Sequence, residues 1–270
     1  MLEKILVFVF GACIGSFLNV CIHRMPLGES LIRPRSHCPK CKKQIAWHDN
    51  IPLISFIILK ARCRHCKARI HLRYFTVELI TAAAFVIFYS YFDKSTFDFV
   101  FYTIFFCGLL VATFIDIGHR IIPDEISIGG MILGFVLSSL RGINFSPLSF
   151  SFKPMLNSFL GIIVGGGIIY STSVLFDLVY FRLLKRPPIQ GETESMGGGD
   201  VKLLAMIGAF LGWQKALLTF FIAPFFGIAV GLFSLIIKKD HTIPYGPFLS
   251  LAALLSLFWA HKIIYFFIFR

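Results

Sequence analysis

Residues 97–116 read FDFVFYTIFFCGLLVATFID, an apolar run that stops at a carboxylate. Coiled as an α-helix, such a run is roughly one bilayer wide. The stretch therefore predicts a membrane-spanning helix that ends at Asp116. Seven further apolar runs make eight in all, namely 5–22, 76–92, 97–115, 126–140, 155–181, 201–212, 216–237 and 248–269.

The composition of the chain agrees with a membrane protein. Hydrophobic residues are 57% of the 270 residues and charged residues only 15%, against roughly 25% in a soluble domain. The mean hydropathy is +0.79. Too few polar residues are present to cover a soluble enzyme, and too many apolar ones for a disordered chain. The fold class expected is an all-α polytopic membrane protein with about eight membrane segments.

The runs divide the chain into three parts: a first transmembrane helix at 1–23, a polar module at 24–75 and a membrane core at 76–270. No small-residue cleavage site follows the first run, so it reads as a retained span rather than a signal peptide. Its Gly11 and Gly15 have the spacing that permits close helix packing, although small residues with no special role explain them equally well. The run 201–212 is only about 18 Å long as a helix, so it either crosses with help or re-enters.

Positive charge is concentrated in the polar module. Between residues 24 and 73 there are 12 Lys and Arg but only two acids, which accounts for +10 of the net charge of +12. Basic loops mark the cytoplasmic side, and the smaller clusters at 182–186 and 238–239 fall on the same side if eight segments cross. Orientation and contact with anionic lipid explain the charge better than nucleic-acid binding does.

Four of the seven cysteines form two CxxC pairs within this module, and the phrases around them repeat at 25 residues. Thiols on the cytoplasmic side stay reduced, so paired cysteines there indicate metal ligands before disulfides. Four thiolates close the tetrahedral shell of a structural Zn²⁺ and leave no open position for catalysis. The expected ligands are Cys38, Cys41, Cys63 and Cys66; free thiols or a redox pair are the alternatives, and nearby histidines are expected on the surface.

Two aspartates lie at the membrane edge, where ionisable residues suggest function. Asp116 ends a span, and Asp200 follows three glycines and opens an apolar helix. If both carboxylates meet across the helix bundle, they can share a proton and activate a water, as in aspartic proteases. The residues alone leave a second interpretation open, in which Asp200 caps a helix and Asp116 is a solvated helix end.

Several short motifs, in this order and spacing, resemble those of the bacterial type IV prepilin peptidases, also called leader peptidase/N-methyltransferases. The resemblance covers nearly the whole chain. The motifs are GSFLNV at 15–20, RMP at 24–26, CPKC at 38–41, WHDNIPL at 47–53, CRHC at 63–66, RYFTVEL at 73–79, IPD at 122–124 and GGGDVKL at 197–203.

This resemblance implies a GxGD-type membrane aspartic protease in which Asp116 and Asp200 are the catalytic pair. It implies cleavage of prepilin and pseudopilin leaders after a glycine, at the cytoplasmic face of the bacterial inner membrane. It also implies methylation of the new N-terminal residue, usually Phe, with S-adenosylmethionine as cofactor. The cysteines match the family's zinc-binding cytoplasmic domain, whereas the methyltransferase residues cannot be read from the sequence. The connections 141–153 and 182–199 look longer than the family's.

Two other functions compete with this interpretation. A proton-coupled transporter also uses membrane carboxylates, but it would carry charges near mid-membrane in several spans. A zinc-stabilised scaffold without chemistry would tolerate alanine at both aspartates and fail only when its cysteines are replaced.

Overall fold

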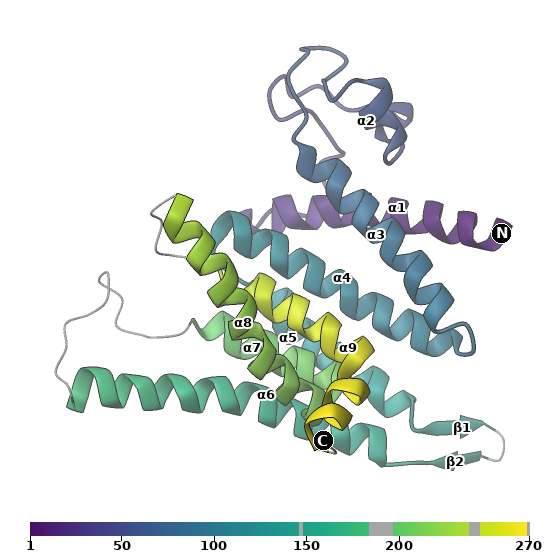
Figure 1. Ribbon diagram of the computed structural model, residues 1–270. Helices are drawn as coiled ribbons and strands as arrows, with labels where there is room; N and C mark the ends of the chain where they lie inside the picture. Colours follow the sequence, from purple (N-terminus) through teal and green to yellow (C-terminus); the bar gives the residue numbers. More distant parts are fainter. Residues whose placement is uncertain (146–147, 184–196, 238–243, 269–270) are drawn as a thin grey trace. The chain divides into compact units, whose positions relative to one another are not determined.

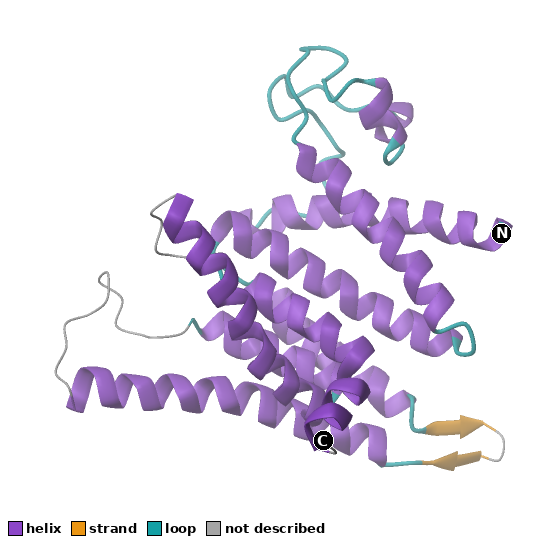
Figure 2. Cartoon of the chain, in the orientation of Figure 1, coloured by secondary structure: helices purple, strands orange, loops and turns teal. Residues whose placement is uncertain are grey.

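The structure is a computed structural model, and it describes residues 1–145, 148–183, 197–237 and 244–268. The chain forms two compact units, Met1–Val111 and Ala112–Arg270. The boundary falls inside one long helix, so each unit is described by itself. Figure 1 gives the order of the helices along the chain, and Figure 2 shows that most of the described residues are helical.

Each of the eight predicted apolar runs contains a helix. The helices begin and end within a few residues of the predicted bounds, as expected when apolar length sets the extent of the helix. They are α1 (Leu2–Arg24), α3 (Leu72–Tyr91), α4 (Thr96–His119), α5 (Asp124–Leu140), α6 (Lys153–Asp177), α7 (Gly198–Leu211), α8 (Trp213–Ile237) and α9 (Gly246–Ile268). A π-helical segment, Leu178–Leu183, continues α6.

Within the described residues, five helices are long and apolar enough to cross a membrane, namely α1, α3, α4, α6 and α8. The structure thus supports a multi-pass helical membrane protein. The described part of α9, up to Ala260, counts as a shorter apolar helix, and α5 and α7 have 17 and 14 residues. A total of eight crossings therefore stays a prediction.

The N-terminal unit is built on the crossing of α1 and α3. A Cβ atom at Gly11 would lie 2.9 Å from the Cα of Ala82, and one at Gly15 would lie 2.7 Å from the Cα of Glu78. Only glycine allows the two backbones to approach this closely. The glycine spacing in the first apolar run therefore has a packing role, and the alternative of no role is wrong.

The predicted polar module, residues 24–75, joins α1 to α3, and its last residues, 72–75, form the first turn of α3. It contains the short helices η1 (Met25–Leu27), η2 (Trp47–Asn50) and α2 (Ile54–Ile58) and two turns around the CxxC pairs. Arg24 fixes the start of the module, since its guanidinium donates to the carbonyls of Ser30 and Pro34 at 2.8 and 2.7 Å.

Helix α7 is the centre of the C-terminal unit. Every residue from Leu203 to Leu211 is buried, and α7 contacts α5, α6, α8 and α9. It crosses α6 so tightly that a Cβ atom at Gly161 or Gly208 would collide with the other's carbonyl oxygen. From Leu203 onward the helix is apolar on all sides, as expected for a helix that packs inside the unit.

The fold prediction needs one small correction. Two three-residue strands, β1 (Ile143–Phe145) and β2 (Leu148–Phe150), pair antiparallel in the predicted polar connection 141–153. The chain reverses direction there between two helices, and the ladder satisfies backbone groups that no helix covers. Figure 2 shows these strands in orange. Most of the 182–199 connection and the basic pair at 238–239 lie outside the described residues.

Candidate active site

Asp116 lies inside the last turns of α4, in the C-terminal unit, and is 6% exposed. Its Oδ2 accepts a hydrogen bond of 2.9 Å from the backbone N–H of Gly246, the first residue of α9. A buried carboxylate is costly unless charge-assisted hydrogen bonds stabilise it. The alternative in which Asp116 is a solvated helix end is therefore wrong.

Asp200 is the third residue of α7 and is partly buried. The cap position belongs to Gly197, which is in the extended conformation, and no side chain caps this helix. Asp200 is thus not the N-cap residue that the second interpretation required. The carboxylate of Asp200 points back toward the start of the helix: its Oδ2 would lie 3.9 Å from a Cβ atom added at Gly197. The unpaired N–H groups of a helix N-terminus favour negative charge there.

One side chain, Ile122, connects the two aspartate positions. A Cβ atom at Gly246 would lie 3.4 Å from Ile122 Cδ1, and one at Gly199 would lie 3.2 Å from Ile122 Cβ. Asp116 is also the charged group whose field acts on Asp200. The structure therefore brings the two predicted residues within electrostatic reach of each other.

Tyr245, just before α9, belongs to the same neighbourhood. Burial, and then the negative charge of Asp200, raise the pKa of Tyr245 to about 12. Its hydroxyl therefore keeps its proton at neutral pH and can donate a hydrogen bond. The sequence analysis missed Tyr245 and Gly246, because nothing in a Tyr-Gly-Pro turn signals that it faces residues 130 positions earlier.

An ion pair joins the starts of two helices beside this site. Lys202 Nζ lies 2.7 Å from Asp124 Oδ1, so the first turn of α7 is tied to the first residue of α5. Both side chains are largely exposed, so the pair contributes at most about 1 kcal/mol. Asp124 thus links the start of α5 to the helix that carries Asp200.

The four module cysteines form one cluster, as predicted. Their sulfur atoms all lie within 4.8 Å of one another, and Cys38 Sγ is 3.8 Å from Cys66 Sγ. Thiolates at about 2.3 Å from a tetrahedral zinc ion are about 3.8 Å apart, so the geometry fits a metal of this kind. Among the described residues no histidine joins this group. The four cysteines could therefore hold a metal such as zinc.

The two CxxC turns have the same backbone. The N–H of Cys38 donates to Lys43 O at 2.9 Å and that of Cys63 to Ala68 O at 2.8 Å, while Lys42 and Lys67 adopt φ values of 58° and 56°. The repeat of 25 residues in sequence is thus a structural repeat. Backbone N–H groups of Cys66 and His65 lower the pKa of Cys63 to about 6, which favours the thiolate form that binds metals.

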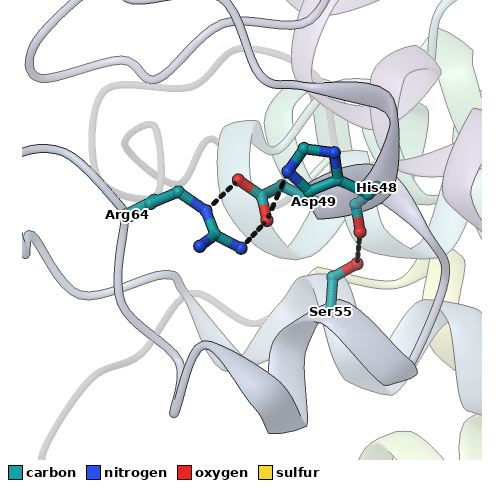
Figure 3. Close-up of polar contacts among 4 residues, drawn as sticks. All are labelled: His48, Asp49, Ser55 and Arg64. Carbon is teal, nitrogen blue, oxygen red and sulfur yellow. Dashed lines mark hydrogen bonds and ion pairs between the residues drawn. The ribbon is translucent and has the colours of Figure 1, made fainter.

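The segment before α2 holds the second turn in place. Figure 3 shows the carboxylate of Asp49 between Arg64 and His48, with two hydrogen bonds from Arg64 at 2.7 and 2.5 Å. Arg64 lies between Cys63 and Cys66. Its hydrogen bonds hold the pKa of Asp49 below the usual range. Ser55 donates to His48 O at 3.2 Å and ties this segment to α2.

A second buried carboxylate, Glu78, lies in the N-terminal unit. It is 8% exposed, and its Oε2 accepts a hydrogen bond of 2.7 Å from the N–H of Leu53. Asn19, 1% exposed, donates to Tyr74 O at 3.0 Å nearby. Three motifs singled out in the sequence, at 15–20, 47–53 and 73–79, thus meet at one polar junction.

Comparison with known proteins gives matches over most of the chain. The model of the Bacterial Peptidase A24 N-terminal domain matches residues 9–92, and that of the Type IV leader peptidase family matches residues 103–232. A "Prepilin leader peptidase/N-methyltransferase" of Aeromonas salmonicida is 31% identical, over 96% of this chain and 91% of its own length. The protein of that name from Pseudomonas aeruginosa is also 31% identical, over 94% and 91%.

A Myxococcus xanthus protein with the same name is 34% identical over 87% of this chain, and the match spans 64% of its length. No solved structure is found to match.

Proposed function

The chain belongs to the type IV leader peptidase family, and from this premise we propose that it removes the leader peptides of type IV prepilins and pseudopilins. Cleavage occurs after a glycine, and the new N-terminal residue, usually Phe, is then methylated with S-adenosylmethionine. The relatives' names pair these two activities. A multi-pass protein of the bacterial inner membrane, with its active site toward the cytoplasm, suits membrane-bound substrates whose leaders lie on that side.

One observation carries the peptidase proposal: the buried carboxylate of Asp116, fixed by Gly246 N–H, lies within electrostatic reach of Asp200. Two carboxylates that close share one proton. The N–H of Gly246 uses one acceptor site on Oδ2 of Asp116, and the remaining acceptor sites of the carboxylate are available to a water. Both aspartates lie near an end of their helix, Asp116 near the end of α4 and Asp200 near the start of α7. This placement favours peptidase chemistry over a proton-coupled transporter, which needs charges near mid-membrane in several spans.

The reaction follows from general acid–base chemistry. The ionised aspartate takes a proton from water as the water oxygen bonds to the scissile carbonyl carbon, and the protonated aspartate gives its proton to the carbonyl oxygen. Collapse of this intermediate re-forms the carbonyl, breaks the C–N bond and returns a proton to the leaving amine. A glycine at the cleaved position exposes its carbonyl without a side-chain clash.

A structural zinc ion on Cys38, Cys41, Cys63 and Cys66 would stabilise the polar module. Four thiolates complete the coordination shell, so the ion supplies folding energy and no reaction step. Basic residues of the module would attract an acidic residue of the substrate. The proposal that S-adenosylmethionine is the cofactor rests on the methyltransferase activity in the relatives' names. We assign no binding residues to it.

The peptidase proposal is tested by Asp200→Asn. The variant should fold and express normally but lose cleavage of a purified prepilin, because asparagine cannot exchange the proton. Product masses after incubation with S-adenosylmethionine report both activities: a leader-sized loss and the gain of one methyl. Asp93→Asn, an exposed aspartate in the turn after α3, is the matched control. Cleavage by purified Asp200→Asn at the wild-type rate would exclude the proposed mechanism.

The metal assignment has its own test. Cys63→Ser should lower the bound zinc, measured by elemental analysis of purified protein, from about one per chain toward zero. Cys107→Ser, which alters a cysteine of α4 outside the cluster, should leave zinc unchanged. Equal zinc contents in both variants would contradict a four-cysteine site.

A further inference from the structure

The short helix α2 exposes an apolar face within the otherwise basic module. Ile54, Ile57 and Ile58, at the spacing of one helix face, are 53%, 64% and 68% exposed; these three residues are called the isoleucine face. On the other side of α2, Ser55 is buried and the ring of Phe56 lies 5.2 Å from that of Phe75. The sequence analysis treated this stretch as part of a polar module, and the structure shows where its apolar residues point.

Two contacts fix the depth of α2 along a membrane helix. Phe75 is in the first turn of α3, and Glu78, which accepts the hydrogen bond from Leu53, is six residues after Leu72. At 1.5 Å per residue, Glu78 is roughly 9 Å along the helix. Helix α3 is one of the five candidate spans. The isoleucine face therefore lies level with the first two turns of a span.

We propose that the isoleucine face, together with Trp47, is an interfacial anchor that inserts into the headgroup–acyl boundary of an anionic leaflet. Trp47 is 81% exposed, and tryptophan prefers this boundary. Its helix η2 is tied to α2 by the hydrogen bond from Ser55 to His48. Short amphipathic elements with basic surroundings bind anionic interfaces by burying such faces.

Charge selects lipid as the occupant rather than another protein segment. Residues 24–73 carry 12 Lys and Arg against two acids, and Lys60 and Arg62 follow α2 directly. Basic residues near an anionic surface are attracted to it, and the attraction adds up over the cluster. The anchor holds the module at a fixed height on the membrane, and this inference stands independently of the proposed chemistry.

The test places one tryptophan on the isoleucine face of the full-length protein. Trp47, Trp213 and Trp259 are the three tryptophans; with all three changed to Phe, Ile58→Trp becomes the reporter and Gln44→Trp, on the first cysteine turn, the matched control. Both proteins are placed in nanodiscs that contain brominated phosphatidylglycerol. Quenching should be at least about twofold stronger at position 58 than at position 44, and weaker in discs whose only brominated lipid is phosphatidylcholine and which contain no anionic lipid.

A second measurement keeps Trp47 as the only tryptophan and compares the native face with the triple variant Ile54→Ser, Ile57→Ser, Ile58→Ser. Lipid quenching of Trp47 should fall in the variant while the helical circular dichroism stays unchanged. Equal quenching at positions 44 and 58 would overturn the proposal. So would a face that responds only to added prepilin or to a second chain in the same disc, since either result assigns it to a protein partner.

Discussion

Two buried carboxylates in this chain are held in the same way but differ in their neighbours. Glu78 accepts one backbone hydrogen bond of 2.7 Å from Leu53, and Asp116 accepts one of 2.9 Å from Gly246. Both are under 10% exposed. In each case a residue distant in sequence supplies the donor that offsets the loss of water. The hydrogen bond described for Glu78 comes from a backbone amide, whereas Asp116 has a second carboxylate, Asp200, within electrostatic reach.

Under the proposed mechanism, this difference separates a structural carboxylate from a reactive one. A single buried carboxylate with matched donors fixes a junction, here between the polar module and α3. Two carboxylates within reach of each other cannot both ionise freely, so they exchange a proton with whatever binds between them. The same kind of hydrogen bond thus serves packing in one unit and, under the proposed mechanism, would position an acid–base group in the other.

The largest difference between the two carboxylates is expected when each is replaced by its uncharged amide. Asp116→Asn should reduce prepilin cleavage by at least about a thousandfold, as expected for a residue that acts in the transition state. Glu78→Gln should retain cleavage within about threefold, because the amide oxygen still accepts the hydrogen bond from Leu53. Initial rates of leader removal by the two purified proteins measure both effects.

The fold of both variants is checked by thermal unfolding in detergent. Glu78→Ala serves as a further comparison, since it leaves the buried Leu53 N–H without its acceptor and should cost about 1–3 kcal/mol of stability. A loss of cleavage in Glu78→Gln as large as that in Asp116→Asn would mean that Glu78 takes part in the reaction, and the distinction between the two carboxylates would be lost.

The donor to Asp116 can be disturbed without touching either aspartate. A Cβ atom at Gly246 would lie 2.7 Å from Oδ2 of Asp116, so Gly246→Ala must move the carboxylate or lengthen its hydrogen bond. Misplacing a catalytic group by a fraction of an ångström to 1 Å costs up to about a hundredfold in rate. We expect kcat to fall by about 10- to 100-fold with little change in KM, measured by steady-state cleavage.

Gly227→Ala is the matched control for that variant. The added Cβ would meet only the ring of Phe248 at 3.7 Å, an ordinary contact distance, so kcat should change little. If Gly246→Ala raised KM and left kcat intact, Gly246 would shape the substrate groove rather than position Asp116.

The sequence predicted what depends on local pattern. Apolar length located the eight long helices, and the spacing of Cys38, Cys41, Cys63 and Cys66 located the cysteine cluster, because both properties are set within a few turns of chain. The two aspartates were found from their place at the ends of apolar runs. Even the repeat around the two CxxC pairs proved to be a repeat of backbone conformation.

The sequence could not reveal hydrogen-bond donors that reach the carboxylates only through tertiary packing. Gly246 reaches Asp116 across 130 residues and Leu53 reaches Glu78 across 25, and neither donor is a side chain with a chemical signature. Helix α2 is too short to show a period, and the burial of α7 on every side depends on four neighbouring helices. Asp200 looked like a cap because residue order alone does not place the first turn of a helix.

The smallest effect is expected at Gly15, which packs against the structural carboxylate Glu78. A Cβ atom at Gly15 would lie 2.7 Å from the Cα of Glu78 and 3.1 Å from the Cβ of Thr81. Gly15→Ala must therefore push α1 away from α3, which should destabilise the protein by about 1–3 kcal/mol. Thermal unfolding in detergent measures the loss.

Gly129→Ala in α5, where an added Cβ meets nothing within 4 Å, is the control and should be neutral or slightly stabilising, since alanine favours the helix by up to about 1 kcal/mol. Because Gly15 and Glu78 lie in the N-terminal unit and both aspartates in the other, Gly15→Ala should leave the cleavage rate per folded molecule unchanged. A fall in that rate without a fall in stability would show that the junction at Glu78 controls the reaction. The two carboxylates would then act together in catalysis, and the distinction between them would fail.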